Sequence, residues 1–253
     1  MSTDLPSIGD LSHRQLFAHE FALISPMRTP SNRWQDLPVI PLRAAEFRGQ
    51  PHLVPQLLPL AELGYEAKLE LLDRNSAHCR ETGQPMFSAL LASDVSPEAM
   101  ATALGKRMLV RIPGGGTAWL RFHDPRVFSS LSWWLDQAQL RFLFGPVRTW
   151  TWPEPRDGCW QQLDRPDPPM SAANRLLITP AQLGRLQRQP VVNRCLAQLG
   201  ADASSAEPLR VRIERLDAHL CQARASGVVA DRDLVRYVMQ AERHRHSRIE
   251  EPV

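Results

Sequence analysis

The stretch from Ala118 to Trp152 constrains the fold most, because it holds five of the seven tryptophans in the chain. Trp119–His123 alternates between two sets of side chains, which predicts a half-buried strand. Asp124 followed by Pro125 predicts the start of a helix, since the Asp carboxylate accepts free amide protons and Pro fits the first helical turn. Residues 147–152 alternate again. The pattern predicts a strand, a helix and a second strand at the centre of the core.

The helix expected after Asp124 has one apolar side. Its residues recur at helical spacing and are expected to be buried: Val127, Phe128, Leu131, Trp134 and Leu135. We expect the helix to end over Gln137–Leu140. Gly145-Pro146 is then expected to break the chain before the second strand.

Two segments of this stretch, RFHDPRVF and FLFGPVRTW, form a motif. Its members are Arg121, Phe122, Asp124, Pro125 and Arg126, then Phe142, Phe144, Gly145, Pro146 and Trp150. The motif resembles the signature of a bacterial family of type VI secretion effector chaperones, also called adaptors, which help to load a toxin onto the VgrG spike. An earlier segment, Phe21-Ala-Leu-Ile, resembles the Tyr-Ala-Leu-Ile-Asp strand of that family, with Phe21 in place of Tyr and Ser25 in place of Asp. The resemblance covers residues 17–152.

The resemblance implies a binding protein, with no catalysis and no cofactor. It implies two partners, a type VI effector encoded nearby and the VgrG spike protein, and a chaperone that stays in the cytoplasm. The motif residues are expected to be mainly structural. Asp124 and Arg126 in particular are interpreted as architecture, and not as partner contacts.

Composition agrees with a soluble globular protein. Of 253 residues, 43% are hydrophobic and 23% are charged, and no apolar run approaches the length of a membrane span. The first residues, MSTDLPSIGD, lack the basic and apolar regions of a signal peptide, so we expect a cytoplasmic protein. The net charge of +3 is too small to indicate nucleic-acid binding.

The fold class expected is α+β, with a sheet packed by helices and then a small helical lobe. The expected division is an N-terminal segment (1–16), an α+β lobe (17–152), a proline-rich linker (153–174) and a helical lobe (175–253). The first elements expected are a helix within 12–20, a strand at 21–24 and a helix at 63–80 that buries Leu69 and Leu72. A strand at 86–93 and a helix starting at Ser96-Pro97 are expected next. A hairpin is then expected from Met108, with its turn at Gly114–Gly116.

The helical lobe is expected to contain four helices. The first two are predicted over residues 180–189 and 191–199, on either side of Pro190. The third buries a narrow seam of Leu209, Ile213, Leu216, Leu220 and Ala223. The last begins at Asp231 and buries Leu234, Val235, Val238 and Ala241.

Candidates for chemistry are weak. His123 and Asp124 with Ser129 and Ser130 could suggest a hydrolase, but triads are recognised by geometry and no GxSxG motif is present. The four cysteines are scattered without metal-ligand spacing, which predicts reduced, structural thiols: Cys79, Cys159, Cys195 and Cys221. The loop before Thr117 lacks the Lys of a phosphate loop, and a hairpin turn explains it better.

Protein binding is the favoured function. Arginines are frequent after residue 174, which indicates first a solvated surface and second a protein interface. Arg is common at such interfaces because its planar fork makes paired hydrogen bonds. Acidic residues are interspersed, so the alternative, nucleic-acid binding by this lobe, ranks lower. The candidate partner-binding residues are Trp119, Trp133, Trp152, Arg212, Arg215 and Arg236. For the tryptophans, a second layer of helices packed over the sheet is the favoured interpretation, and an exposed patch that holds a partner is the alternative.

Overall fold

The computed structural model describes residues 11–42, 49–154, 158–167, 176–200 and 207–249. The chain divides into two compact units, a sheet-containing unit that ends at Pro180 and a helical unit that starts at Ala181. The predicted α+β fold class, with helices at the C-terminal end, is confirmed.

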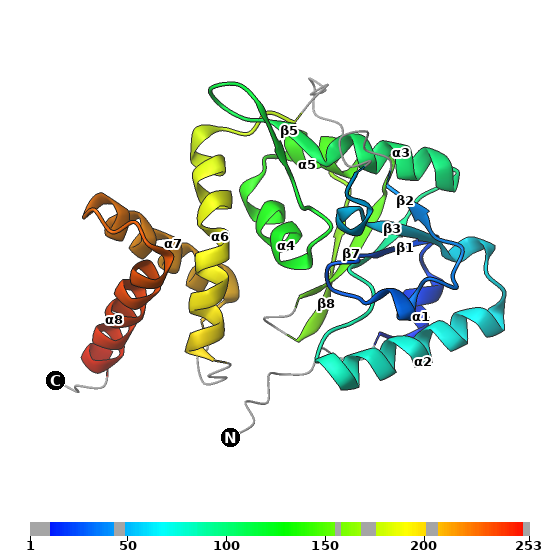
Figure 1. Ribbon diagram of the computed structural model, residues 1–253, viewed down its shortest axis with the longest axis horizontal. Coiled ribbons are helices and arrows are strands. Elements are labelled where there is room, and N and C mark those ends of the chain that lie inside the picture. The colour runs from blue at the N-terminus through cyan, green and yellow to red at the C-terminus, as the bar shows by residue number, and fades with distance from the viewer. Residues whose placement is uncertain (1–10, 43–48, 155–157, 168–175, 201–206, 250–253) are drawn as a thin grey trace. The chain divides into compact units, whose positions relative to one another are not determined.

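The first unit is built on a six-stranded antiparallel sheet with strand order β2-β3-β1-β4-β7-β8 (Figure 1). The strands are β1 (Phe21–Ile24), β2 (Ile40–Pro41), β3 (Gln56–Pro59), β4 (Ala89–Ala92), β7 (Thr149–Glu154) and β8 (Cys159–Asp164). The strands predicted near residues 21–24, 86–93 and 147–152 are therefore confirmed. β8 pairs with β7 along six residues. The sheet thus extends into the range where the sequence predicts a linker.

Five α-helices accompany the sheet in this unit. They are α1 (His13–Phe17), α2 (Tyr65–Thr82), α3 (Pro97–Arg107), α4 (Pro125–Trp134) and α5 (Gln137–Phe144), with short 3-10 turns η1 (Ser31–Arg33), η3 (Pro51–Leu53) and η4 (Leu60–Glu62). The predicted start at Ser96-Pro97 is confirmed, because the Ser96 hydroxyl accepts a hydrogen bond from the Ala99 amide.

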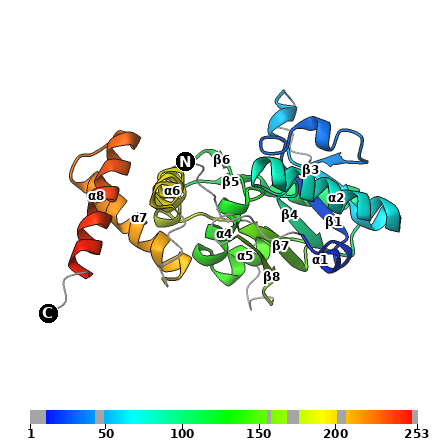
Figure 2. The same ribbon diagram turned by 90° about the horizontal axis from the view of Figure 1, so that it is seen from below.

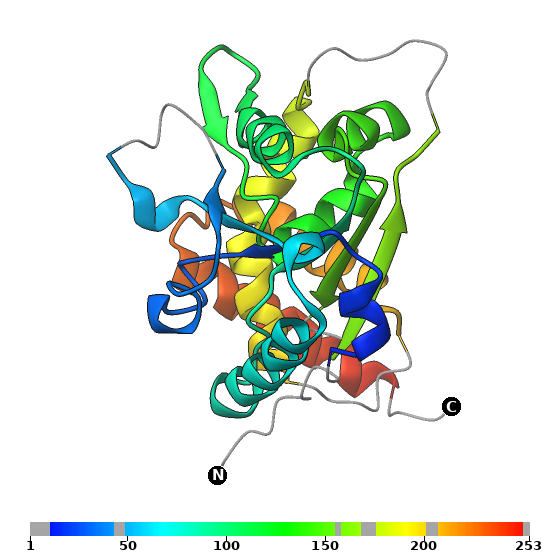
Figure 3. The ribbon, with the colours of Figure 1, turned by 90° about the vertical axis from the view of Figure 1, so that its right-hand side faces the viewer.

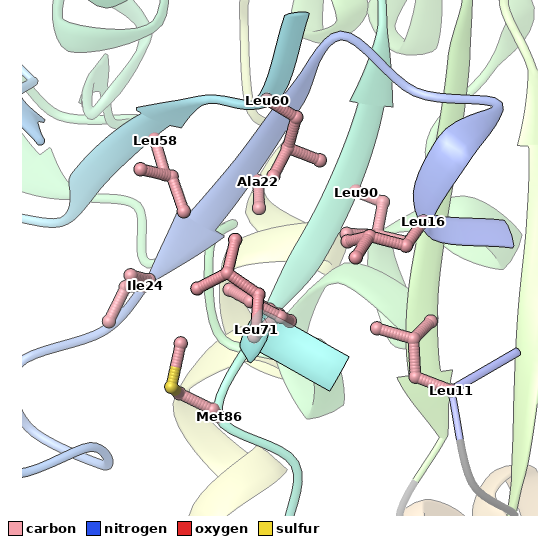
Figure 4. Close-up of a cluster of buried hydrophobic side chains, with 10 residues drawn as sticks. Leu11, Leu16, Ala22, Ile24, Leu58, Leu60, Leu71, Met86 and Leu90 are labelled. Carbon is pink, nitrogen blue, oxygen red and sulfur yellow. The ribbon is translucent and has the colours of Figure 1, made fainter. Parts of the chain in front are cut away.

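One face of the sheet packs on α1 and α2. Ala22 pairs with Leu58 on one neighbouring strand and Leu90 on the other, so all three side chains lie on this face. They join a buried cluster with Leu71 of α2 (Figure 4). Leu69 and Leu72 are predicted to be the buried positions of α2, and this prediction is wrong. Leu71 is buried, whereas Leu69 and Leu72 are half-buried.

The opposite face carries the aromatic core. Phe21, Leu91 and Trp150 lie in register across three strands. Trp150 is fully buried and stacks on Phe128 of α4, with ring centroids 4.4 Å apart. Figures 1 and 3 show α2 and α3 on opposite sides of β1, so helices cover both faces. The central role predicted for the tryptophan-rich stretch follows from this packing.

The strand predicted over Trp119–His123 is wrong. β6 (Thr117–Trp119) ends there and pairs only with β5 (Leu109–Arg111), in a separate two-stranded sheet. The chain then turns, because the Asp124 amide donates to the Arg121 carbonyl oxygen at 2.9 Å. The hairpin itself is confirmed, with positive φ at all three glycines of its turn, Gly114–Gly116.

The predicted end of the helix that starts after Asp124 is wrong. α4 ends at Trp134, and a second helix, α5, begins at Gln137 where the sequence predicts an ending. Asp136 and Gln139 form a capping box: the Asp136 carboxylate accepts from the Gln139 amide at 2.8 Å, and the Gln139 side chain accepts from the Asp136 amide. The Asp-x-x-Gln spacing is the local signal that predicts this helix.

Replacing Asp136 with Ala should lower the free energy of unfolding by about 0.5–2 kcal/mol, since α5 loses its N-cap and gains nothing in exchange. Asp136 is exposed, so no buried charge is left without a partner. Urea unfolding followed by tryptophan fluorescence measures this loss. Asp136→Asn should retain most of the stability, and an equal loss in both variants would contradict the capping argument.

The second unit consists of α6 (Pro180–Leu199), α7 (Leu209–Ala225) and α8 (Asp231–Ile249), all shown in Figure 2. The predicted break at Pro190 is wrong: α6 runs through it as one helix. Gln189, Val191 and Val192 are all buried, and this packing outweighs the hydrogen bond that proline removes. The predicted seam of α7 is confirmed at Ile213, Leu216, Leu220 and Ala223, while Leu209 is half-buried.

In the part of the chain that the structure describes, no helix is both long enough and apolar enough to cross a membrane.

Candidate functional site

The charged residues of the motif meet around one buried carboxylate. Asp124 caps α4, and its side chain is only 3% exposed. Its oxygens accept hydrogen bonds from the Arg126 amide (3.1 Å), from the Arg126 guanidinium (2.8 and 3.1 Å) and from Arg121 (3.3 Å). Arg28, from the loop after β1, lies 3.6 Å away. We call Arg28, Arg121, Asp124 and Arg126 the Asp124 cluster.

The Asp124 cluster keeps its carboxylate ionised. Burial alone would raise the pKa of Asp124, but the hydrogen bonds and charge of Arg126, with the charges of Arg28 and Arg121, lower this pKa to about 2. Arg28 is half-buried, with 12% of its side chain exposed, and it also donates to the Gln84 amide oxygen at 2.7 Å. The first turn of α4 therefore begins at a buried carboxylate whose negative charge is compensated by arginine side chains.

Arg28 is the member of the Asp124 cluster that sequence reasoning missed. It lies far from the motif along the chain, in the loop after β1, and no local pattern marks it. The predicted helix-cap role of Asp124 is confirmed. Its ion pairs with Arg121 and Arg126 add a second role, because they bring the two motif arginines onto the same carboxylate.

His123 does not form a catalytic pair. It is 1% exposed, and neither ring nitrogen has a hydrogen-bond partner among the described residues. Burial lowers the pKa of His123 to about 3, although the adjacent Asp124 opposes this shift, so the ring is neutral at pH 7. The Ser130 hydroxyl donates to the Arg126 carbonyl oxygen instead. No serine is activated by His123 in this geometry.

The remaining motif residues lie in the core or at its turns. Phe122 and Trp150 are fully buried, with ring centroids 5.8 Å apart. Gly145 ends α5 at φ +56°, and a Cβ there would lie 2.5 Å from the Arg107 guanidinium. The Pro146 carbonyl oxygen accepts a hydrogen bond from the Ser93 hydroxyl at 2.9 Å. Pro125 is buried in the first turn of α4.

The predicted partner-binding tryptophans are not gathered on one surface patch. Trp152 is 5% exposed and packs on Phe128, with ring centroids 5.0 Å apart, so its ring is part of the core. Trp119 and Trp133 are half-buried. Trp119 lies 5.8 Å from the His123 ring and 5.6 Å from the Arg121 guanidinium.

The three predicted arginines of the helical unit differ in exposure. Arg215 joins the helices, since it makes a bidentate bond to Glu242 of α8 at 2.9 Å and a further bond to Glu207. Burial lowers the pKa of Arg215, but the bonds to the two carboxylates outweigh burial and raise it. Arg212 is half-buried, and Arg236 on α8 is 64% exposed.

Thiol and metal chemistry have little basis in the described residues. Within them, no group of three or more His, Cys, Asp or Glu side chains is placed to hold a metal ion. All four cysteines are free thiols. Burial raises the pKa of Cys195 to about 11, so this thiol stays protonated at neutral pH.

Comparison with known proteins gives one family match. The model of a domain of unknown function (DUF4123) matches residues 42–141. No match was found among the curated proteins or the solved structures. The matched range is less than half of the chain. It runs from the residue after β2 into α5, and includes Arg121–Arg126 but neither β1 nor β7. The chain is therefore similar to the DUF4123 family over the segment that holds Arg121, Asp124 and Arg126.

Proposed function

We propose that this protein is a non-catalytic adaptor that binds a type VI secretion effector and promotes its loading onto the VgrG spike. The observation that carries the proposal is the DUF4123 match over residues 42–141. This range contains the Arg121–Arg126 block, on which the resemblance to the effector-chaperone family also rests. The family match and the motif resemblance thus fall on one segment.

The placement of the motif supports binding over catalysis. His123 is buried and has no serine partner, so a hydrolase centred on it has no support from the geometry. The motif arginines are engaged by Asp124, which makes the motif a structural device. A binding protein needs only a stable scaffold and a surface, and a stoichiometric mechanism requires no reactive group.

Co-expression with the product of the adjacent gene tests this proposal. The expected result is a stable complex on tandem affinity purification and size-exclusion chromatography, with the neighbour insoluble or scarce when expressed alone. VgrG added to the complex should retain the effector more strongly than VgrG added to effector alone. Two proteins that elute separately, each soluble by itself, would refute the adaptor role for that pair.

A further inference from the structure

The helical unit has an open groove between α6 and α8, with a volume of about 700 Å³. Its walls and floor include Arg194, Arg232, Val235, Arg236, Met239 and Arg243. The five of these residues on α8, from Arg232 to Arg243, are spaced by 3, 1, 3 and 4 positions, so they share one face of that helix. Four arginines and two apolar side chains therefore line the groove, and none of its described lining residues is acidic.

Three of the groove arginines, Arg194, Arg232 and Arg236, carry charges that a partner can engage. Arg194 pairs with Asp231 across the two helices, and Arg236 pairs with Asp233 at 3.3 Å. All four of these side chains are about half exposed or more, and exposed pairs of this kind contribute about 0–1 kcal/mol, so a partner carboxylate can replace the aspartate at small cost. Arg232 is exposed and has no acidic partner among the described residues.

We propose that this groove binds an acidic, amphipathic helical segment of the effector. Carboxylates would pair with the arginines, and apolar residues at helical spacing would contact Val235 and Met239. The face from Arg232 to Arg243 is about 16 Å long, which corresponds to three turns of a partner helix. The apolar floor favours a peptide over nucleic acid, whose charged backbone offers no matching apolar stripe. The inference rests on the proposed function for the identity of the partner.

A designed peptide tests the groove directly. The probe is a fluorescent peptide of about twelve residues, with Glu and Leu at helical spacing, titrated by anisotropy with the full-length protein. A peptide of the same composition in scrambled order and a DNA duplex serve as comparisons. We expect the ordered peptide to bind more tightly than both. Arg232→Glu and Met239→Glu should each weaken its binding at least about tenfold, which is ~1.4 kcal/mol.

Arg224→Glu is the matched control. Arg224 is exposed on α7, outside the groove, and its substitution changes the charge as much as Arg232→Glu does. We expect it to leave peptide binding within about twofold. Equal binding of the scrambled peptide, tighter binding of DNA, no binding of the ordered peptide, or insensitivity to both groove substitutions would each overturn the inference.

The co-expressed complex separates this inference from the adaptor proposal. Arg232→Glu and Met239→Glu should reduce recovery of the effector, while Arg224→Glu should not. If the complex forms and withstands both groove substitutions, the groove is not the effector site and the adaptor role stands. If the ordered peptide binds in the groove but no complex forms with the neighbouring gene product, the adaptor role fails for that pair and the groove remains a peptide site.

Discussion

Replacing Asp124 with Ala should lower the free energy of unfolding of the sheet unit by ~3–5 kcal/mol. Two terms contribute. The helix cap on α4 is lost, at about 0.5–2 kcal/mol. The buried Nη1 atom of the half-buried Arg28 also loses the carboxylate that faces it. Asp136→Ala removes a cap of the same residue type from the next helix without a buried charge, so it is the matched control. A loss no greater than that of Asp136→Ala would show that the Asp124 cluster adds nothing beyond the cap.

Asp124→Asn separates the two terms. The Asn side-chain oxygen can still accept from the Arg126 amide, but the negative charge is gone. We expect Asn to recover about 1 kcal/mol relative to Ala. The pH dependence supplies a second check, because the folded pKa of Asp124, about 2, lies below its ordinary value of 3.8. A depressed folded pKa gives stability that is present above about pH 5 and lost as pH falls toward 2, here ~2 kcal/mol.

The difference in stability between wild type and Asp124→Asn should therefore shrink as pH falls from 5 to 2. Tryptophan fluorescence is the suitable probe, since all seven tryptophans precede residue 181 and report on the sheet unit. A difference that stays constant across this pH range would mean that the carboxylate of Asp124 is not held ionised by the arginines.

The parts of the fold that the sequence predicts correctly are those with local causes. Ser96-Pro97 and Asp124-Pro125 start helices because the capping side chain and the amide it binds lie within three residues of each other. The seam of α7 depends only on 3.6-residue periodicity. The glycines at 114–116 turn the hairpin because they adopt positive φ without steric cost.

The errors arise where distant packing decides. Nothing local determines that Arg28 reaches the carboxylate of Asp124. Pro190 would end an isolated helix, yet buried neighbours carry α6 through it. The alternation of residues 147–152 is typical of a strand with one exposed face. Trp152 is buried nevertheless, because Phe128 of α4 packs on its ring. The sequence does not predict the groove between α6 and α8 either, because its two walls come from separate helices. Of the residues that line it, only Arg236 is among the predicted partner-binding residues.

Replacing Arg215 with Met should destabilise the helical unit by ~3–5 kcal/mol. Arg215 links α7 to α8 through Glu242, which is only 1% exposed, and it also pairs with Glu207, which lies just before α7. Met fills similar space without charge, so the cost comes from a buried carboxylate that has lost its bidentate partner. Arg210→Met is the matched control: its pair with Glu214 is exposed, and its loss should cost less than about 1 kcal/mol.

The two units allow this effect to be localised. The helical unit contains no tryptophan, so its unfolding should appear in circular dichroism at 222 nm and leave the fluorescence transition unchanged. Arg215→Met combined with Glu242→Gln should recover part of the loss, since a neutral pair avoids the buried charge. If the loss of unfolding free energy in the double variant equals the sum of the losses in Arg215→Met and Glu242→Gln, the two side chains act separately. The ion pair would then not link α7 to α8.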